Sequence, residues 1–139
     1  MSMFRRRLMM GSKKSYMFYF PLIQMSAPLS NPSLTLAGPL SGFAQGKTYR
    51  IKFNFHVVAH RTTTTTAYVR IYISNQGAFS FKNLKLQLVP TTPGDYTYTG
   101  SVDTTVTADL TGATMLFGGR FDNNASDFII SELYISEVV

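Results

Sequence analysis

The sequence contains no cysteine, so neither a disulfide framework nor a thiolate metal site can form. Tryptophan is also absent, and charged residues make up only 14% of the 139 residues, well below an average soluble domain. The surface must therefore consist largely of Thr, Ser, Asn, Gly and Tyr, a composition suited to β-sheets and to large contact surfaces. The lack of cysteine agrees with a reducing cytoplasm.

Acidic residues are missing from the first two thirds of the chain. Twelve of the 13 Lys and Arg precede Asp95, whereas all seven Asp and Glu lie from Asp95 onward, giving a formal net charge of +6. One interpretation is that solvated faces are unevenly charged without consequence. The other is that basic and acidic surfaces of neighbouring molecules meet, which electrostatic complementarity favours.

The residues needed for catalysis or metal binding are scarce. Two His and seven carboxylates supply almost none of the parts of a triad or of a general acid and base pair. His56 and His60 lie about 13 Å apart along an extended strand at ~3.3 Å per residue, too far for a zinc pair. Asp122, Asn123, Asn124 and Asp127 match no calcium-loop spacing, so an Asx-rich turn is favoured. We expect no enzymatic activity, metal or cofactor.

The first fifteen residues differ from the rest of the chain. They carry five positive charges and four Met, and they show no strand pattern. A secretory signal peptide is one interpretation, but Tyr16, Tyr19, Pro21 and Gln24 interrupt the apolar run that would follow it. No run approaches the roughly 18 apolar residues of a membrane-spanning helix, so we expect no membrane insertion.

Two other interpretations treat residues 1–15 as an arm, docked either on a partner or on its own domain. Ordering a segment without strand periodicity needs offsetting contacts, which favours docking on a partner protein. Adaptable Met side chains beside cations suggest an apolar groove rimmed by acidic groups. The docking residues predicted from this pattern are Phe4, Arg5, Arg6, Arg7, Leu8, Met9 and Met10. Nucleic acid is the less favoured partner of this arm, because genome-packaging arms usually carry longer basic runs.

Beyond residue 15 the chain alternates apolar and polar residues with a period of two. In the clearest stretch, residues 47–58, Phe53 and Phe55 alternate with Arg50 and Lys52. This period predicts half-buried strands with the basic residues outward. Residues 67–74 and 83–89 repeat the pattern. We therefore predict that Phe53, Phe55, Ile71 and Leu86 are buried, with Leu84 and Leu88 in the same phase as Leu86.

Further strands are predicted at 16–24, 33–37, 96–102, 104–110, 114–121 and 128–138, separated by turn residues. Eight or nine short strands with no amphipathic helical stretch indicate a two-sheet antiparallel β-sandwich of the jelly-roll type. The domain is expected over residues 16–139, preceded by the extended basic arm. The Pro residues fall at positions expected for turns and sheet edges.

One aromatic row stands out on the outward phase of the strand at 67–74. Tyr68, Arg70 and Tyr72 would lie side by side, and Tyr96 and Tyr98 could form a second row. Such rings could stack on a glycan, or they could pack under a neighbouring subunit, where Tyr and Arg are favoured. The absence of Trp favours the protein interface.

Two resemblances bear on function. Residues 46–139, with GKTYRIKF, VRIYIS, PTTPGDYTYTG and ASDFIISELYISEV, resemble jelly-roll carbohydrate-binding modules, which implies a non-catalytic sandwich and a glycan partner. Separately, the opening MFRRRLMM resembles the start of many proteins of phages of gut Bacteroidales, including crAss-like phages. Together these resemblances imply a virion protein such as a head decoration, a head-fibre base or a tail accessory. Other virion proteins would be its partners in a multicopy or homo-oligomeric assembly, and the alternative is a carbohydrate-binding or adhesive module.

Overall fold

The computed structural model describes residues 16–30, 33–74, 81–109 and 114–139. Eight strands form in this part of the chain, and every pairing between them is antiparallel. They are β1 (Phe18–Leu29), β2 (Ser33–Ser41), β3 (Thr48–Arg61), β4 (Ala67–Ser74), β5 (Lys82–Val89), β6 (Gly94–Thr107), β7 (Thr114–Phe121) and β8 (Asn124–Glu137). The predicted arm at residues 1–15 lies outside the described residues.

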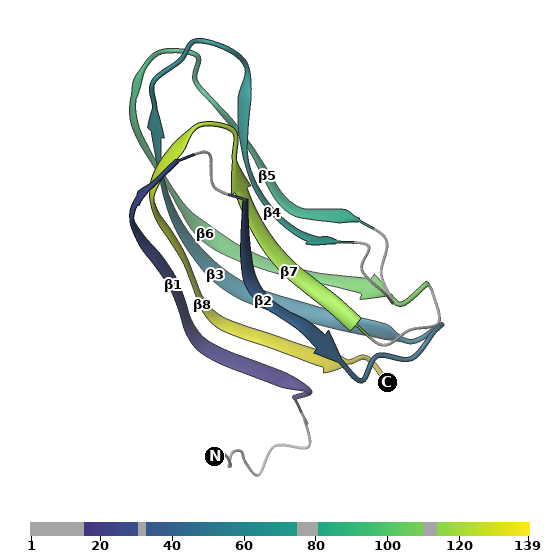
Figure 1. Cartoon of the computed structure of the whole chain (residues 1–139). Coiled ribbons are helices and arrows are strands. Elements are labelled where there is room, and N and C mark those ends of the chain that lie inside the picture. The colour runs from purple at the N-terminus through teal and green to yellow at the C-terminus, as the bar shows by residue number, and fades with distance from the viewer. Residues whose placement is uncertain (1–15, 31–32, 75–80, 110–113) are drawn as a thin grey trace.

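The strands make two four-stranded sheets, which we call sheet A and sheet B. Sheet A has the order β1-β8-β3-β6, and sheet B has the order β2-β7-β4-β5. Among the connections that pass from one sheet to the other, those between β3 and β4, between β5 and β6 and between β7 and β8 lie together at one end of the molecule (Figure 1). This strand order defines a jelly-roll sandwich and confirms the predicted fold class.

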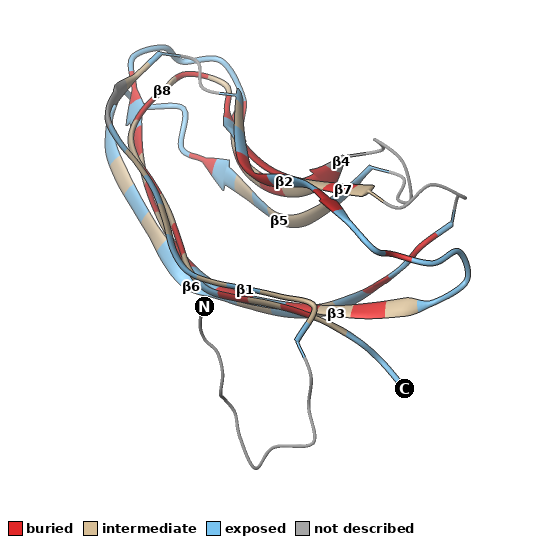
Figure 2. Ribbon diagram, turned by 60° about the horizontal axis from the view of Figure 1, so that its bottom comes forward, coloured by how far each residue is buried: buried red, intermediate tan, exposed pale blue. Residues whose placement is uncertain are grey.

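The core lies between the sheets and is built from the inward phases of the strands (Figure 2). Along β3 the alternation holds without exception, because Ile51, Phe53 and Phe55 are buried while Lys52 and Asn54 are exposed. The Phe53 ring meets Phe117 of sheet B edge to face, with ring centroids 5.2 Å apart. Burial of these side chains is the main force that holds the two sheets together.

The strand predicted at 83–89 is present as β5, but the predicted burial of Leu86 and Leu88 is wrong. Leu86 and Leu88 are 49% and 53% exposed, whereas Val89 is fully buried, so the phase is opposite to the predicted one. Two side chains of the inward phase, Lys85 and Gln87, lie at the partly open margin of the sandwich. The register between β4 and β5 shifts at Leu84, which packs against the core. A register shift reverses the phase on its two sides.

The segments 96–102 and 104–110, predicted as two strands, belong to the single strand β6 as far as Thr107. All fourteen residues of β6 pair in unbroken register with β3. Nothing in this stretch ends a strand, because it contains no Pro and its only internal Gly, Gly100, pairs with Phe55. Because the alternation of β6 is unbroken, Tyr96 and Tyr98 lie on its inward side, where they are partly buried and pack against the core. The second outward tyrosine row is therefore wrong.

Ion pairs join the basic and acidic parts of the chain within one molecule. Arg50 of β3 donates two hydrogen bonds to Asp103 of β6, at 2.8 and 2.5 Å, and Lys47 Nζ lies 3.3 Å from a Glu137 carboxylate oxygen. A hydrogen bond of 2.5 Å also joins His60 Nδ1 to Asp95 Oδ1. The antiparallel register thus brings the late acidic residues beside early basic ones, which accounts for much of the uneven charge without a neighbouring molecule.

Candidate functional surfaces

Sheet B carries an apolar patch on its outer side, which we call the apolar face. It comprises Tyr68, Arg70 and Tyr72 of β4, together with Phe81, Leu86 and Leu88 at β5. The register places Tyr68 opposite Leu88 and Arg70 opposite Leu86, so the predicted row and the misassigned leucines share one surface. The sequence prediction therefore found half of this surface. The other half was missed because the leucines were assigned to the core.

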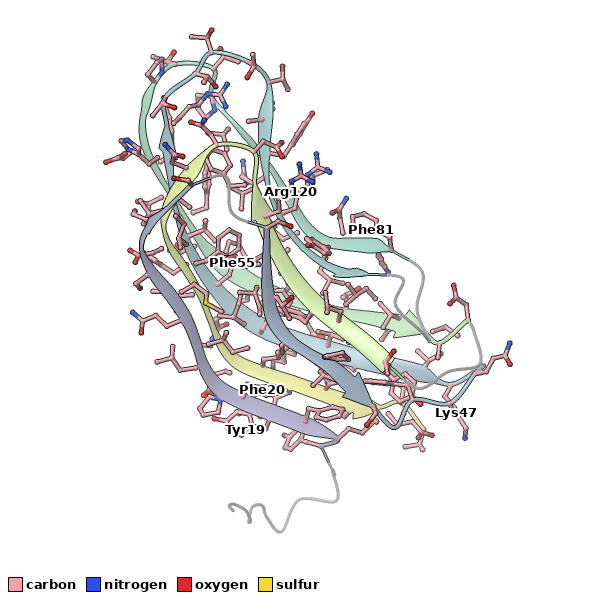
Figure 3. All side chains as sticks on the ribbon, viewed as in Figure 1. Tyr19, Phe20, Lys47, Phe55, Phe81 and Arg120 are labelled. Carbon is pink, nitrogen blue, oxygen red and sulfur yellow. The ribbon has the colours of Figure 1, made fainter. Side chains whose placement is uncertain are left out.

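The Tyr72 ring is held flat against the sheet. It lies over Gly118 of β7, where an added Cβ would come within 2.6 Å of the ring's Cζ. On its other side Tyr72 contacts Phe81, with ring centroids 5.3 Å apart and an interplanar angle of 34°. Phe81 is 51% exposed, and Figure 3 labels it beside sheet B. A glycine under an aromatic ring gives this part of the apolar face a low, broad surface.

An arginine pair crosses the apolar face. The Arg70 guanidinium lies 5.6 Å from the centroid of the Tyr68 ring, a cation–π distance. Arg70 and Arg120, which are register partners on β4 and β7, share Asp122 at 3.9 and 3.2 Å. Two cations and one carboxylate leave a positive charge among the exposed apolar side chains. This combination of aromatic residues, leucines and arginine is typical of protein interfaces.

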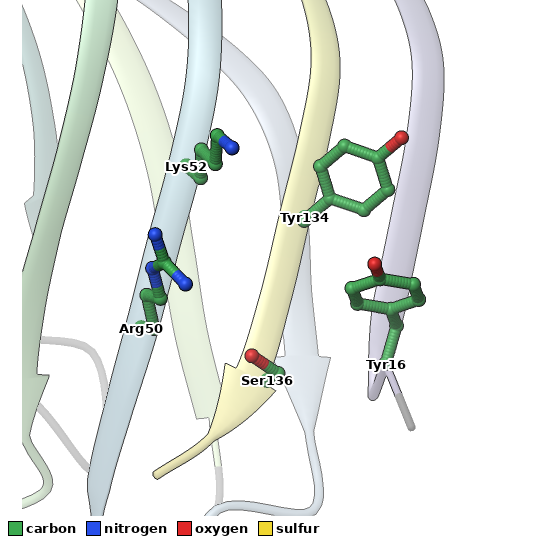
Figure 4. A pocket seen from close by; sticks show the side chains of 5 residues that line it. All are labelled: Tyr16, Arg50, Lys52, Tyr134 and Ser136. Carbon is green, nitrogen blue, oxygen red and sulfur yellow. The ribbon is translucent and has the colours of Figure 1, made fainter. Parts of the chain in front are cut away.

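Sheet A carries a different surface, a shallow pocket that we call the tyrosine pocket. Its lining comes from Tyr16, which precedes β1, from Arg50 and Lys52 of β3, and from Tyr134 and Ser136 of β8. The two tyrosine rings lie toward β1 and the two cations lie on β3 (Figure 4). Arg50 is committed to Asp103, whereas Lys52 forms no ion pair with any described residue. The pocket thus combines aromatic rings, a hydroxyl and a cation.

Glu132 organises the aromatic rings of this pocket. It sits where the pairing of β8 shifts, in the left-handed region with φ 51°. Its carboxylate accepts hydrogen bonds from the hydroxyls of Tyr19 and Tyr134, at 2.8 and 3.1 Å. The Tyr134 ring lies 4.7 Å from the Tyr16 and Tyr19 rings, measured between centroids. The alternation pattern alone could not reveal this cluster, because it depends on the pairing of the two ends of the domain.

Burial, followed by hydrogen bonding to Glu132, raises the pKa of Tyr134 and the pKa of Tyr19 above the ordinary tyrosine value. A raised pKa means that the folded state favours the protonated phenol, so this contribution to stability is complete below pH ~10 and is lost as the pH rises further. Both phenols are therefore hydrogen-bond donors at neutral pH.

One buried cation was not predicted from the sequence. Arg61, at the end of β3, is 1% exposed, and its guanidinium nitrogens have no hydrogen-bond partner among the described residues. The alternation that places Ala59 inward also places Arg61 inward, so the signal was present in the sequence. Across the described residues no three His, Asp or Glu side chains gather as a metal site, and no helix long and apolar enough to cross a membrane is found there.

No protein-family model matches the chain, and no curated protein matches its sequence. Similar solved structures do exist. The CBM22-1 xylan-binding domain from Paenibacillus barcinonensis Xyn10C is 10% identical, with a TM-score of 0.47 over 83% of this chain and 70% of that domain. A pentameric capsid protein isolated from metagenomic phage sequences is 16% identical, with a TM-score of 0.39 over 82% of this chain and 62% of that protein. A CBM4 structure is 19% identical, with a TM-score of 0.34 over 76% of this chain and 70% of that one.

These identities and TM-scores are too low to transfer a function. The xylan binding and the pentameric capsid assembly are properties of those proteins, and the same type of fold serves many purposes.

Proposed function

We propose that this protein is a non-enzymatic structural component of a phage virion, which joins its assembly through the apolar face and through residues 1–15. The observation that carries the proposal is the apolar face itself. Leu86, Leu88 and Phe81 are each about half exposed and lie beside an arginine pair. Single exposed apolar residues are ordinary, but a group of them around a cation marks a contact surface.

The virion setting rests on the opening sequence MFRRRLMM and its resemblance to proteins of Bacteroidales phages. Residues 1–15 also carry five positive charges and no acid, which suits docking on an acidic partner protein. A decoration, a fibre base or a tail accessory protein would each use a sandwich in this way. Its partners would be other virion proteins and further copies of the same chain.

The proposal is tested by competition for incorporation into particles between tagged wild-type and variant chains. Leu86→Asp with Leu88→Asp should reduce incorporation about tenfold or more, because each carboxylate would have to be desolvated in the contact. The matched control is Thr63→Asp with Thr65→Asp, which adds the same charge at exposed positions between β3 and β4. Circular dichroism should show all variants folded.

The second part of this experiment is the deletion of residues 2–15. We expect a folded β domain that no longer competes for incorporation. Normal incorporation of the truncated chain would refute the docking role of the arm, and failure to fold would place the arm in the core. Absence of the protein from purified particles by mass spectrometry would refute the virion role altogether.

A second candidate function is carbohydrate binding, and the tyrosine pocket favours it. Tyrosine rings can stack on a sugar, while Lys52 and the Ser136 hydroxyl could bind its polar groups. The cation points to a glycan bearing carboxylate or sulfate. Calorimetric titration with acidic and neutral glycans tests this alternative, which requires binding that is lost in both Tyr16→Ala and Lys52→Glu. Binding of neither glycan class would remove it.

A further inference from the structure

Three of the four sheet edges carry features that hinder the addition of another strand. Strand β1 contains Pro21 and Pro28 and has a register shift, and β2 contains Pro39 and has two shifts. Strand β5 is only eight residues long, carries two lysines and shifts its register once. Proline, lysine, short length and irregular pairing are the usual protections of an edge against another strand.

Strand β6 lacks all of these protections. It runs for fourteen residues without Pro, Lys or Arg, and its register with β3 is unbroken from Gly94 to Thr107. Among the described strands it pairs with β3 alone. Lys82 Nζ donates a hydrogen bond to the Thr105 carbonyl at 3.3 Å, and this contact covers the C-terminal end of β6. Among the described residues nothing pairs with the free side of the stretch from Asp95 to Asp103, which is therefore an open, regular edge of the kind that accepts an added strand.

The charge of β6 indicates what kind of strand it would accept. Asp95 and Asp103 are its only ionisable residues besides tyrosine, so β6 itself carries acid and no base, although His60 and Arg50 of the adjacent β3 bond to these two carboxylates. A second copy of β6 would bring aspartates against aspartates, which is unfavourable. Residues 1–15 of the same chain have the opposite character, with five bases and no acid. They are also long enough, since fifteen extended residues span roughly 50 Å at ~3.3 Å per residue.

The position of this basic segment favours a neighbouring molecule over its own. Residues 1–15 join sheet A at β1, whereas β6 is the opposite edge of that sheet. To reach β6 of its own molecule the segment would have to cross the outer face of sheet A. Pairing between molecules requires no such crossing. Because donor and acceptor edges differ, the contact would be head to tail, the kind that generates rings or filaments.

We propose that residues 3–10 of one copy pair with β6 of the next copy, so that sheet A continues from molecule to molecule. This inference rests on the proposed assembly function and names one of its contacts. Backbone hydrogen bonds would supply most of the affinity, so the arm needs no strict alternation of its own.

Because the sequence contains no cysteine, a cysteine introduced at one position is the only thiol of its chain, and cross-linking tests the contact directly. Full-length Leu8→Cys and full-length Thr99→Cys chains are mixed under assembling conditions and treated with a short bis-maleimide. We expect a cross-linked heterodimer, with both positions confirmed by mass spectrometry. Thr99 is exposed in the open stretch of β6, and the matched control is Gln24→Cys, which is exposed on the protected edge β1. The control mixture should yield at least fivefold less product.

A second measurement uses lysine, the natural protection of sheet edges. Thr97→Lys with Thr99→Lys should reduce the larger species seen by analytical ultracentrifugation at least tenfold, whereas Thr97→Ser with Thr99→Ser should leave them unchanged. Circular dichroism checks that both variants are folded.

Each of the following results would overturn the inference. Thr99→Cys chains that cross-link to each other would indicate pairing of two β6 strands. Equal cross-linking to Gln24→Cys would show no preference for β6. A Leu8→Cys, Thr99→Cys chain that cross-links only within itself would place the arm on its own domain. If the lysine variant assembles normally while Leu86→Asp with Leu88→Asp does not, the inference fails and the proposed function stands. A wild-type chain that remains monomeric and absent from particles refutes both.

Discussion

Strands β3 and β5 have the same kind of sequence but opposite behaviour. Both alternate apolar and polar residues, yet β3 buries its apolar side chains, whereas β5 exposes Leu86 and Leu88. Strand β3 lies inside sheet A and is paired on both sides by β8 and β6. Strand β5 is the last strand of sheet B, paired only with β4, with a register shift at Leu84.

The difference shows that alternation does not always fix the phase of a strand that is paired on one side only, as β5 is. On β3 a one-residue slip would expose five or more core side chains, so a single register is strongly preferred. On β5 the cost of a reversed phase is smaller, because long side chains such as Lys85 and Gln87 can reach solvent from the margin of the sandwich. An edge strand is therefore free to place apolar residues outside, where they can serve a contact.

The largest effect is expected at the centre of β3. Phe53→Ala should lower the free energy of unfolding by ~3–5 kcal/mol, because it removes a buried ring and leaves a cavity beside Phe117. Urea denaturation followed by circular dichroism measures this change. A loss below ~1 kcal/mol would mean that β3 does not anchor the core, and the contrast with β5 would disappear.

A smaller effect is expected on the outward side of the same strand. Arg50→Ala would remove the two hydrogen bonds that Arg50 donates to Asp103, so the urea midpoint should fall slightly. Lys52→Ala should leave the midpoint nearly unchanged, because Lys52, although it is the register partner of Asp103, forms no ion pair with any described residue. Both substitutions carry the same change of charge, so equal effects would show that net charge, and not the Asp103 pair, is responsible.

The smallest effect is expected on β5. Leu86→Ala should change the free energy of unfolding by no more than ~0.5 kcal/mol, because the side chain is already half exposed and packs against no core residue. The same denaturation experiment compares it with Phe53→Ala. A loss of ~2 kcal/mol or more would show that Leu86 is buried in solution and does not belong to the apolar face.

Much of the candidate surface was predictable from local sequence. The outward row of Tyr68, Arg70 and Tyr72 follows directly from the period of two, since Val69 and Ile71 between them are buried. The leucines that complete the apolar face were not predictable in this way. Their phase depends on one register shift, and no local signal marks it. The tyrosine pocket was even less predictable from the sequence, because it brings residue 16 together with residues 50, 134 and 136.

The sequence by itself determined the class of fold. Strand periodicity, turn residues and the lack of helical patterns suffice for a β-sandwich, because local side-chain alternation directly decides which face of a strand is buried. Only the tertiary structure decided which strands are central and which are edges, and therefore where alternation could be reversed. It also decided which charges meet, since the register of β3 with β6 pairs residues more than thirty positions apart. Such pairings depend on the packing of the whole domain, which no local stretch of sequence specifies.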